Sequence, residues 1–273
     1  IIIYNNIMSD INNYLFHLWT SKTGPLRYLS ELLRDLLTEG NIECTKAGLR
    51  LMSVSSNREV LIHLKLLSDK FEEYRCDEPL NLGLNLEDYF KVIKLVESNE
   101  TLRFFVDKSD LNTLGIQRFN KEENISNTKY LTLMDIEKNT LEVPEIEFEN
   151  VIVMNSGRFQ KICKEIYSFS NKVQITSTNN ILQFKAHDTS VKQEIIIKPT
   201  NTDTGIKYEI NDKSDNIIYG VYNVKYLVQF SKCANLSNTV KIYMANDLPL
   251  LIECDVAQLG SVRLLLAPQT DDD

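Results

Sequence analysis

Four segments of the chain repeat their apolar residues with the period of an α-helix. These segments are residues 25–37, 86–96, 156–169 and 224–233. In the first of them the apolar positions are 26, 29, 32, 33, 36 and 37, which fall on one face of a helix. Pro25 suits an early helical position, and Asn85, Ser156 and Asn223 belong to the residue types that cap helix N-termini. The pattern therefore predicts four short helices.

The remaining apolar residues mostly alternate with polar ones or form short β-branched runs, which is typical of β-strands. Nine segments have this character: residues 49–54, 60–66, 101–107, 130–134, 151–154, 173–177, 194–198, 239–244 and 250–254. The chain is thus expected to be rich in strands, with two short helices in each half.

The helices recur at a fixed distance along the chain. Arg27 precedes Lys161 by 134 residues, Lys91 precedes Lys225 by 134, and the strands that start at positions 101 and 239 are 138 residues apart. This regularity predicts two domains of one topology. Residues 121–150 hold eight acids and three lysines without a clear period, which predicts a connector. The expected organisation is an N-terminal extension with the first strand (1–23), an N-terminal domain (24–120), the connector and the start of the second domain (121–150), and a C-terminal domain (151–273).

The composition is that of a globular protein. Of the 273 residues, 43% are hydrophobic and 25% are charged, and no apolar run approaches the roughly 20 residues of a membrane span. Residues 1–7 are apolar but lack the cationic region and cleavage site of a signal peptide, and Met8 is a candidate start. The five cysteines, an odd number without a C-x-x-C pair, favour reduced thiols over disulfides or a zinc site.

No segment carries a recognised catalytic signature. The P-loop, dinucleotide-binding, H-E-x-x-H and G-x-S-x-G patterns are all missing from the sequence. The three histidines, His17, His63 and His187, lie far apart, and each is expected to be a solvated or hydrogen-bonded strand residue. Cys163 falls on the apolar stripe of a predicted helix, as a buried structural thiol would. A catalytic function is therefore the weaker hypothesis, and no cofactor or metal is expected.

The net charge of −8 argues against nucleic acid as a partner, but the charges are segregated. The helix windows 26–37, 86–97, 157–168 and 223–233 hold nine cations and six acids, a net charge of +3, which leaves −11 for the rest of the chain. Cations recur at spacings of three or seven residues, which places them on one side of each helix. One such face is ordinarily a solvated surface. Four such basic faces in an acidic protein favour a polyanion as the partner. Duplex DNA is favoured over a single strand because no row of aromatic residues accompanies the cations.

Six short motifs occur in a fixed order along the chain. They are residues 71–77 (FEEYRCD), residues 82–86 (LGLNL), Leu133-Met134-Asp135, the helix that contains Ser156-Gly157 and Ile162-Cys163, Asp247-Leu248-Pro249-Leu250, and Leu266-Ala267-Pro268. In this order and spacing they resemble the family of proliferating cell nuclear antigen (PCNA), the eukaryotic sliding clamp. The similarity extends over nearly the whole chain. A high content of Asn, Ile and Lys is compatible with an AT-rich genome, such as that of a large DNA virus or a protist.

The resemblance implies an α+β DNA clamp fold, in which two similar domains, each with antiparallel sheets outside and two helices inside, assemble as a homotrimeric ring. Eight cations would then line the central channel and hold duplex DNA loosely: Arg27, Arg34, Lys91, Lys94, Lys161, Lys164, Lys225 and Lys232. Ring closure would pair an edge strand of one subunit with an edge strand of the next. The segments that match these edge strands are residues 111–119 and 191–198. Retention on DNA would be topological.

The resemblance also implies an apolar pocket below the connector for a short helical plug of partner proteins, the PIP box. The matching positions are Val54, Leu61, Leu141, Val143, Pro144, Pro249, Leu265, Ala267 and Pro268. Leu265 departs from the family, which often has tyrosine there, so partner preference is expected to differ. The lysine that cellular clamps modify with ubiquitin is matched by Asn179, which cannot form an isopeptide bond.

The expected function is that of a DNA polymerase processivity factor without catalytic activity. Its expected partners are double-stranded DNA without sequence preference, DNA polymerase and other PIP-box proteins, a clamp loader and further copies of the chain, but no membrane. It would act in replication and repair, in the nucleus or at a viral replication site. Three alternatives stay open: a subunit of a heterotrimeric checkpoint clamp, an enzyme that acts on nucleic acid, and a monomer that holds DNA by charge alone.

Overall fold

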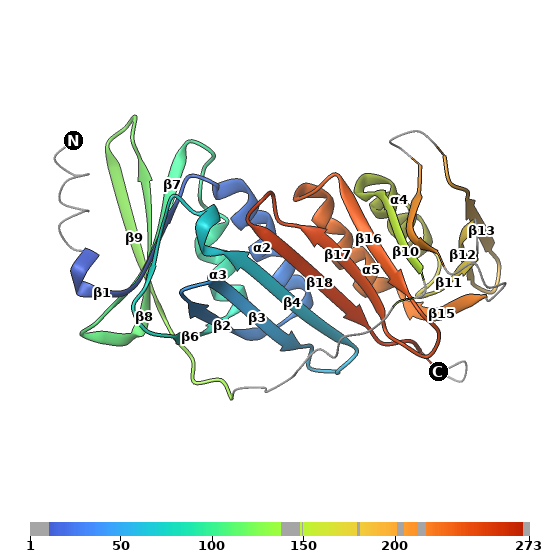
Figure 1. Ribbon diagram of the computed structural model, residues 1–273, viewed down its shortest axis with the longest axis horizontal. Coiled ribbons are helices and arrows are strands. Elements are labelled where there is room, and N and C mark those ends of the chain that lie inside the picture. Colours follow the sequence, from blue (N-terminus) through green and yellow to red (C-terminus); the bar gives the residue numbers. More distant parts are fainter. Residues whose placement is uncertain are drawn as a thin grey trace. The chain divides into compact units, whose positions relative to one another are not determined.

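The computed structural model describes residues 11–137, 148, 150–178, 181–200, 205–211 and 217–269 (Figure 1). The chain forms two compact units. Unit 1 comprises Ile1–Ser53, His63–Thr140 and Ala257–Gly260, and unit 2 comprises Val54–Ile62, Leu141–Val256 and Ser261–Asp273. Each unit is therefore completed by a short segment from the other half of the sequence.

The first half of the chain contributes two α-helices among its strands. In chain order its elements are η1 (Ile11–Asn13), β1 (Tyr14–Thr20), α2 (Thr23–Leu36), β2 (Glu39–Thr45), β3 (Gly48–Val54), β4 (Val60–Leu67), η2 (Ser68–Lys70), β5 (Glu73–Cys76), β6 (Leu80–Asn85), α3 (Leu86–Ile93), β7 (Glu100–Asp107), β8 (Asp110–Asn120) and β9 (Ile125–Thr132). Helix α3 contacts α2 and the strands β2, β6 and β9.

The second half of the chain repeats this sequence of elements. They are β10 (Asn150–Asn155), α4 (Ser156–Tyr167), β11 (Lys172–Thr178), β12 (Ile181–His187), β13 (Lys192–Ile197), β14 (Lys207–Asn211), β15 (Ile218–Asn223), α5 (Val224–Phe230), η3 (Ser231–Asn235), β16 (Thr239–Met244), β17 (Leu250–Asp255) and β18 (Gly260–Leu266). Helix α4 contacts α5, η3, β10 and β16.

The strand orders of the two halves correspond one to one. The order β5-β1-β7-β8-β9 in the first half has its counterpart in β14-β10-β16-β17-β18, and β4-β3-β2-β6 has its counterpart in β13-β12-β11-β15. The registered strand pairs are antiparallel. The predicted α+β fold and the predicted duplication of one topology are therefore confirmed.

Helices α3, α4 and α5 begin where asparagine side chains supply the missing hydrogen bonds. Asn85 Oδ1 accepts from the backbone N–H of Asp88 at 3.1 Å, and Asn223 Oδ1 accepts from that of Lys225 at 3.1 Å, as the sequence predicts. The cap of α4 is Asn155 and not Ser156, which is the first helical residue and donates its hydroxyl to the carbonyl of Ser237. Helix α2 starts two residues earlier than expected, which makes Pro25 its third residue.

The core of unit 1 is built from one face of each sheet and the apolar stripes of its two helices. Phe16 of β1, Leu33 of α2, Leu64 of β4, Tyr89 of α3 and Phe104 of β7 all line one apolar cavity of about 40 Å³. Unit 2 repeats the arrangement, with Phe159, Phe184 and Phe230 fully buried. Because successive strand residues point to opposite faces, the alternation seen in the sequence marks the side that faces each core.

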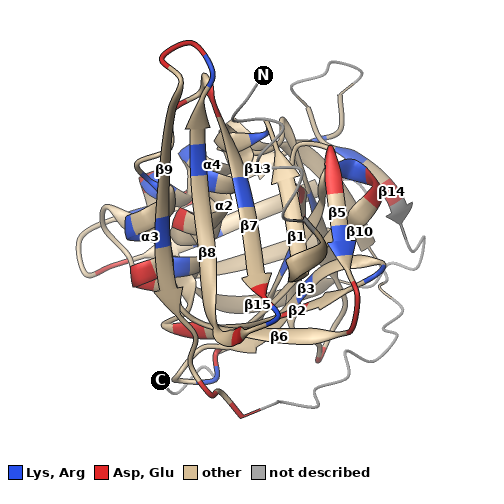
Figure 2. Cartoon of the chain, turned by 90° about the vertical axis from the view of Figure 1, so that its left-hand side faces the viewer, with Lys and Arg blue, Asp and Glu red and all other residues tan. Residues whose placement is uncertain are grey.

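Strand β9 overturns two expectations. The segment 121–150 was predicted to be a connector with a strand only at residues 130–134, but residues 125–132 pair with β8 in a continuous antiparallel register, for example Gln117 with Thr128. The prediction that residues 111–119 form an edge is also wrong, because β8 lies between β7 and β9. The edge strand is β9, which Figure 2 shows at one margin of the sheet with β5 at the other. The other expected edge, residues 191–198, is confirmed as β13, which ends its sheet.

All five cysteines are free and buried, as expected for reduced thiols. Burial raises the pKa of the Cys44 and Cys163 thiols well above the usual range, so both stay protonated and unreactive. Within the described residues no helix is long and apolar enough to cross a membrane.

A buried histidine holds the outer side of β1 to the neighbouring strand. His17 Nε2 accepts from Arg103 Nε at 2.8 Å, while His17 Nδ1 lies 3.7 Å from the Glu73 carboxylate. The Arg103 guanidinium also stacks on the rings of Tyr14 and Phe105, at 4.9 and 5.4 Å from their centroids. Burial, reinforced by Arg103, lowers the pKa of His17 to about 4, so the imidazole is neutral at pH 7.

The depressed pKa of His17 should make the free energy of unfolding fall as the pH is lowered from 6.5 to about 4. In this window the unfolded chain binds a proton at His17 that the folded chain does not, which costs up to about 3 kcal/mol. His17→Gln keeps an acceptor for Arg103 without titrating, and should flatten the dependence in urea titrations at several pH values. The control is His187→Gln at an exposed histidine. Equal pH dependence in the wild type and His17→Gln would refute the assignment.

Candidate nucleic-acid and partner interfaces

The eight cations predicted to contact DNA lie on the helices or directly after them. Arg27 and Arg34 belong to α2, Lys161 and Lys164 to α4, and Lys225 to α5. Lys91 is on α3, Lys94 caps its C-terminus, and Lys232 lies in η3 after α5. The opposite faces of the helices are apolar and buried, for example Leu29 and Leu33 of α2 and Phe159 and Ile162 of α4. The cations are therefore on the helix faces that point away from the cores.

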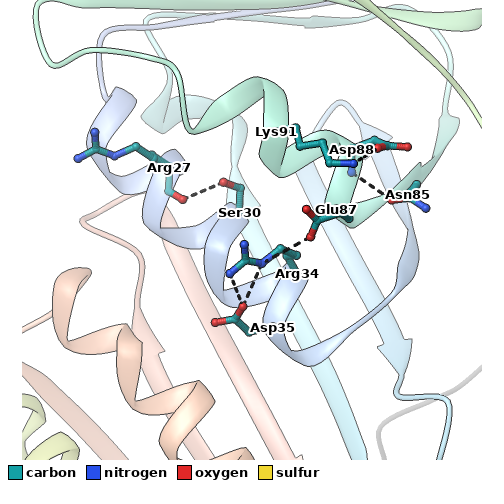
Figure 3. Close-up of polar contacts among 8 residues, drawn as sticks. All are labelled: Arg27, Ser30, Arg34, Asp35, Asn85, Glu87, Asp88 and Lys91. Atoms are coloured by element: carbon teal, nitrogen blue, oxygen red, sulfur yellow. Dashed lines mark hydrogen bonds and ion pairs between the residues drawn. The ribbon is translucent and has the colours of Figure 1, made fainter.

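In unit 1 part of this positive charge is neutralised by acids of the same helices (Figure 3). Arg34 Nε lies 3.0 Å from Asp35 Oδ1 and 3.9 Å from Glu87 Oε2, and its guanidinium stacks 4.1 Å from the Phe90 ring centroid. Lys91 Nζ donates to Asp88 Oδ1 at 2.9 Å, and this carboxylate raises the pKa of Lys91. Arg34 and Lys91 thus already hold anionic partners from the chain itself.

In unit 2 the helix cations are exposed, and their charges are not neutralised within the described part of the chain. Arg158, Lys161, Lys164 and Lys225 have no carboxylate partner among the residues that the structure describes, and all four are exposed. Lys225 Nζ lies 5.7 Å from the Tyr226 ring centroid, while Lys232 is half-buried. Among the described residues, α4 and α5 therefore carry more unpaired positive charge than α2 and α3, where Arg27 and Lys94 have no carboxylate partner either.

Arg158 belongs to this exposed set, although sequence reasoning left it out of the DNA-binding residues. Its spacing of three from Lys161 is the signal that could have included it, because residues three apart share one helix face. Flexible, exposed ammonium and guanidinium groups of this kind attract phosphates without reading bases. Chemically, the α4–α5 surface suits a mobile polyanion contact.

The positions predicted for partner binding gather in unit 2 as far as the structure describes them. Leu265 of β18 pairs with Leu251 of β17. Two residues further along the same register, Ala267 corresponds to Pro249 on the same face of the sheet. Val54 ends β3, Leu61 is the second residue of β4, and Pro268 follows β18. Leu141, Val143 and Pro144 lie outside the described residues, as does Asn179.

Hydrogen bonds attach the segment Val54–Ile62 to the rest of unit 2. The backbone N–H of Ala267 donates to the Glu59 carbonyl at 2.9 Å. Asn223 Nδ2 lies 3.5 Å from Glu59 Oε2, and Asn57 Nδ2 donates to the Tyr226 hydroxyl. These contacts fix Leu61 beside the C-terminal end of β18.

Sequence reasoning missed the apolar residues that continue this surface across the sheet. Leu251 pairs with Leu265 on one side and with Tyr243 of β16 on the other, and the Tyr243 ring contacts that of Phe148 at 5.3 Å between centroids. Burial raises the pKa of Tyr243, so its hydroxyl is neutral. The alternation within β16 and β17 could have found these positions. Leu265 itself is only 9% exposed, so it belongs to the floor of the surface.

Comparison with known proteins places both halves in one family. The models "Proliferating cell nuclear antigen, N-terminal domain" and "Proliferating cell nuclear antigen, C-terminal domain" match residues 18–140 and 142–269. The chain is 29% identical over 264 residues to the probable DNA polymerase sliding clamp 1 of Paramecium bursaria Chlorella virus 1 and 27% identical over 260 residues to proliferating cell nuclear antigen of Caenorhabditis elegans. Each alignment covers 95% of this chain and 98% of the relative.

A third relative is the probable DNA polymerase sliding clamp of Acanthamoeba polyphaga mimivirus. It is 34% identical over 224 residues, which are 81% of this chain and 47% of that protein. Two consecutive copies of one α+β topology, each matched by its own clamp domain model, define a DNA sliding clamp. The chain belongs to the proliferating cell nuclear antigen family, as its motifs suggested.

The contacts of Arg34 predict that it stabilises the fold more than Lys91 does. Arg34→Gln removes a partly buried cation–π contact and a link to Glu87 of α3, and should lower the free energy of unfolding by about 1 kcal/mol. Lys91→Gln removes one exposed pair within a helix and should have a smaller effect. Urea denaturation followed by circular dichroism measures both. A larger decrease for Lys91→Gln would contradict the role given to Arg34.

Proposed function

We propose that three copies of this chain close into a ring around duplex DNA and serve as a processivity factor for a DNA polymerase. The observation that carries the proposal is the duplicated fold, in which β9 of the first half and β13 of the second half each lie at the end of a sheet. Three copies would bring six repeats of one topology into the ring. The activity is that of a scaffold, and catalysis is left to the partners.

The side chains at both edges support pairing of β9 of one copy with β13 of the next. Tyr130 of β9 is 69% exposed and Ile196 of β13 is 50% exposed, and the neighbouring Ile125 and Val191 are also exposed apolar residues. Exposed apolar strand edges promote aggregation unless another chain covers them. Because β9 and β13 are different surfaces, their contact is head-to-tail, and such contacts either close into a ring or grow without limit.

The proposed DNA contacts are weak because most of them come from exposed, mobile cations. Arg27, Arg34, Lys91, Lys94, Lys161, Lys164, Lys225 and Lys232 are proposed to face the duplex, with Arg158 added. Since Arg34 and Lys91 are already paired with acids, the strongest attraction should come from α4 and α5. Phosphate contacts of exposed lysines are screened by salt and carry no sequence preference, which suits a ring that slides.

Partner proteins are proposed to bind on the apolar surface of unit 2 that Leu61, Pro249, Leu251, Leu265 and Ala267 form. A polymerase and other proteins with a PIP box, and a clamp loader, would use it in replication and repair. Leucine at position 265 offers no hydroxyl, so an incoming apolar anchor should bind better there than a polar one. The place of action is proposed to be a site of DNA replication, in the nucleus or in a virus-infected cell.

Ring closure can be tested at the two edges. Tyr130→Asp and Ile196→Asp each place a charge in the proposed contact and should reduce the species at three times 31.5 kDa to one of 31.5 kDa. Light scattering coupled to size exclusion measures these masses. Tyr219→Asp is the matched control, because Tyr219 is 57% exposed on β15, an edge strand outside the proposed contact. A wild-type protein that is monomeric at all concentrations would refute the ring.

Topological retention separates a ring from a protein that holds DNA by charge alone. We expect the chain to thread onto linear duplex DNA with biotinylated ends. Once streptavidin blocks the ends, the protein should stay bound during a high-salt wash. It should dissociate when a restriction enzyme cuts the duplex. A charge-bound monomer would be removed by the wash.

The same assay tests the charge distribution. Lys161→Gln/Lys164→Gln/Lys225→Gln should lower the amount loaded at low salt and reduce the salt slope by about 0.9 for each phosphate that the variant no longer neutralises. Arg34→Gln/Lys91→Gln should have a smaller effect, since these two cations are already paired. Equal loading of the triple variant and the wild type would exclude the α4–α5 contact.

A further inference from the structure

The sheet β13-β12-β11-β15 of unit 2 carries a polar hollow on the face opposite the core. Its buried face presents Val173, Ile175 and Phe184, whereas Lys172, Gln174 and Lys185 alternate with these residues and point the other way. The hollow has a volume of about 740 Å³ and is lined chiefly by Lys172, Gln174, Lys185, His187, Lys192 and Glu194. Such a volume is within the range of ligand-binding clefts.

Three basic side chains stand in one row across this hollow. His187 of β12 pairs directly with Lys192 of β13. On the other side, the register that pairs Gln174 with Lys185 sets Lys172 of β11 opposite His187. Lys172 and Lys192 are therefore two strand spacings apart, about 10 Å. The two lysines thus flank His187 on one face of the sheet.

The nearby acids do not neutralise the row. Among the described residues, Glu194 is the one carboxylate in the lining, and it lies 3.6 Å from Lys185. Asp188, next to His187, accepts a hydrogen bond from the Thr189 hydroxyl, and Glu165 of α4 accepts one from Gln193. Lys172 and Lys192 have no carboxylate partner within the described part of the chain. The hollow thus has a positive charge that these acids leave uncompensated in an acidic protein.

We propose that this hollow binds an extended acidic peptide segment of a partner protein. Its cations are spread over about 10 Å, which is wider than a single phosphate or carboxylate but suits successive acidic side chains of an extended chain. Gln174 and Asn171 add amide donors, and Val221 offers an apolar contact beside them. The site does not depend on ring closure, because strand pairing at β13 uses its backbone edge and the hollow uses the face of the sheet.

The probe is a fluorescein-labelled peptide in which glutamate and serine alternate over about eight residues, followed by fluorescence anisotropy at about 50 mM salt. Lys172→Glu/Lys192→Glu should weaken binding at least about tenfold. Lys172→Glu alone, on an inner strand, should weaken it about threefold and leave the assembly mass unchanged. The matched control is Lys46→Glu/Lys65→Glu, which makes the same charge change at exposed lysines of unit 1 and should leave binding unchanged.

Four results would overturn the proposal. If the control variant loses as much affinity for the acidic peptide as the Lys172→Glu/Lys192→Glu variant does, binding rests on general charge attraction. If the wild type binds a lysine–serine peptide as tightly as the acidic peptide, charge plays no part. Displacement of the probe by an equal concentration of pyrophosphate would mean a compact anion site. Probe binding that occurs only after deletion of residues 271–273 would assign the hollow to the acidic end of the chain itself. Selective binding of the acidic peptide by the wild type, weakened about threefold in Lys172→Glu and at least about tenfold in Lys172→Glu/Lys192→Glu, supports the proposal.

Discussion

Unpaired backbone groups at strand edges are the constraint on which this molecule depends. Each half of the chain folds into the same arrangement of strands, and each has a strand with exposed apolar residues at an end of a sheet, β9 or β13. N–H and C=O groups in such edges gain hydrogen bonds when a complementary strand arrives. Because the two edges differ and lie in different halves, the chain is suited to join head-to-tail with copies of itself. The proposed ring follows from this one requirement.

The duplicated fold has diverged in its charges while it kept its strand order. In unit 1 the helix cations Arg34 and Lys91 hold acids of α2 and α3, and Arg34 also packs on the Phe90 ring. In the described part of unit 2 the cations of α4 and α5 remain available to a ligand. The sheet faces diverge as well, since unit 1 buries His17 against Arg103 and unit 2 presents Lys172, His187 and Lys192 in one row. The surface chemistry of the two halves has therefore diverged while their topology stayed the same.

The sequence by itself determined the local structure and the repeat. Helical periods placed all four helices, asparagines marked two of their N-termini, and a constant distance of 134 residues between corresponding helices showed the duplication. These features depend on neighbours within a few residues, so they can be read along the chain. The motif series also identified the family, which both domain models confirm.

Only the tertiary structure decided which strand is an edge and which cations are available. Residues 125–132 show no apolar alternation because neither face of β9 is deeply buried, and its pairing with β8 rests on backbone hydrogen bonds that any residue type except proline can make. Likewise, Arg34 and Lys161 both lie on predicted helices, and only the structure shows that Arg34, besides its neighbour Asp35, contacts Glu87 and Phe90 of a second helix. Both properties depend on partners far away in the chain, which a local pattern does not contain.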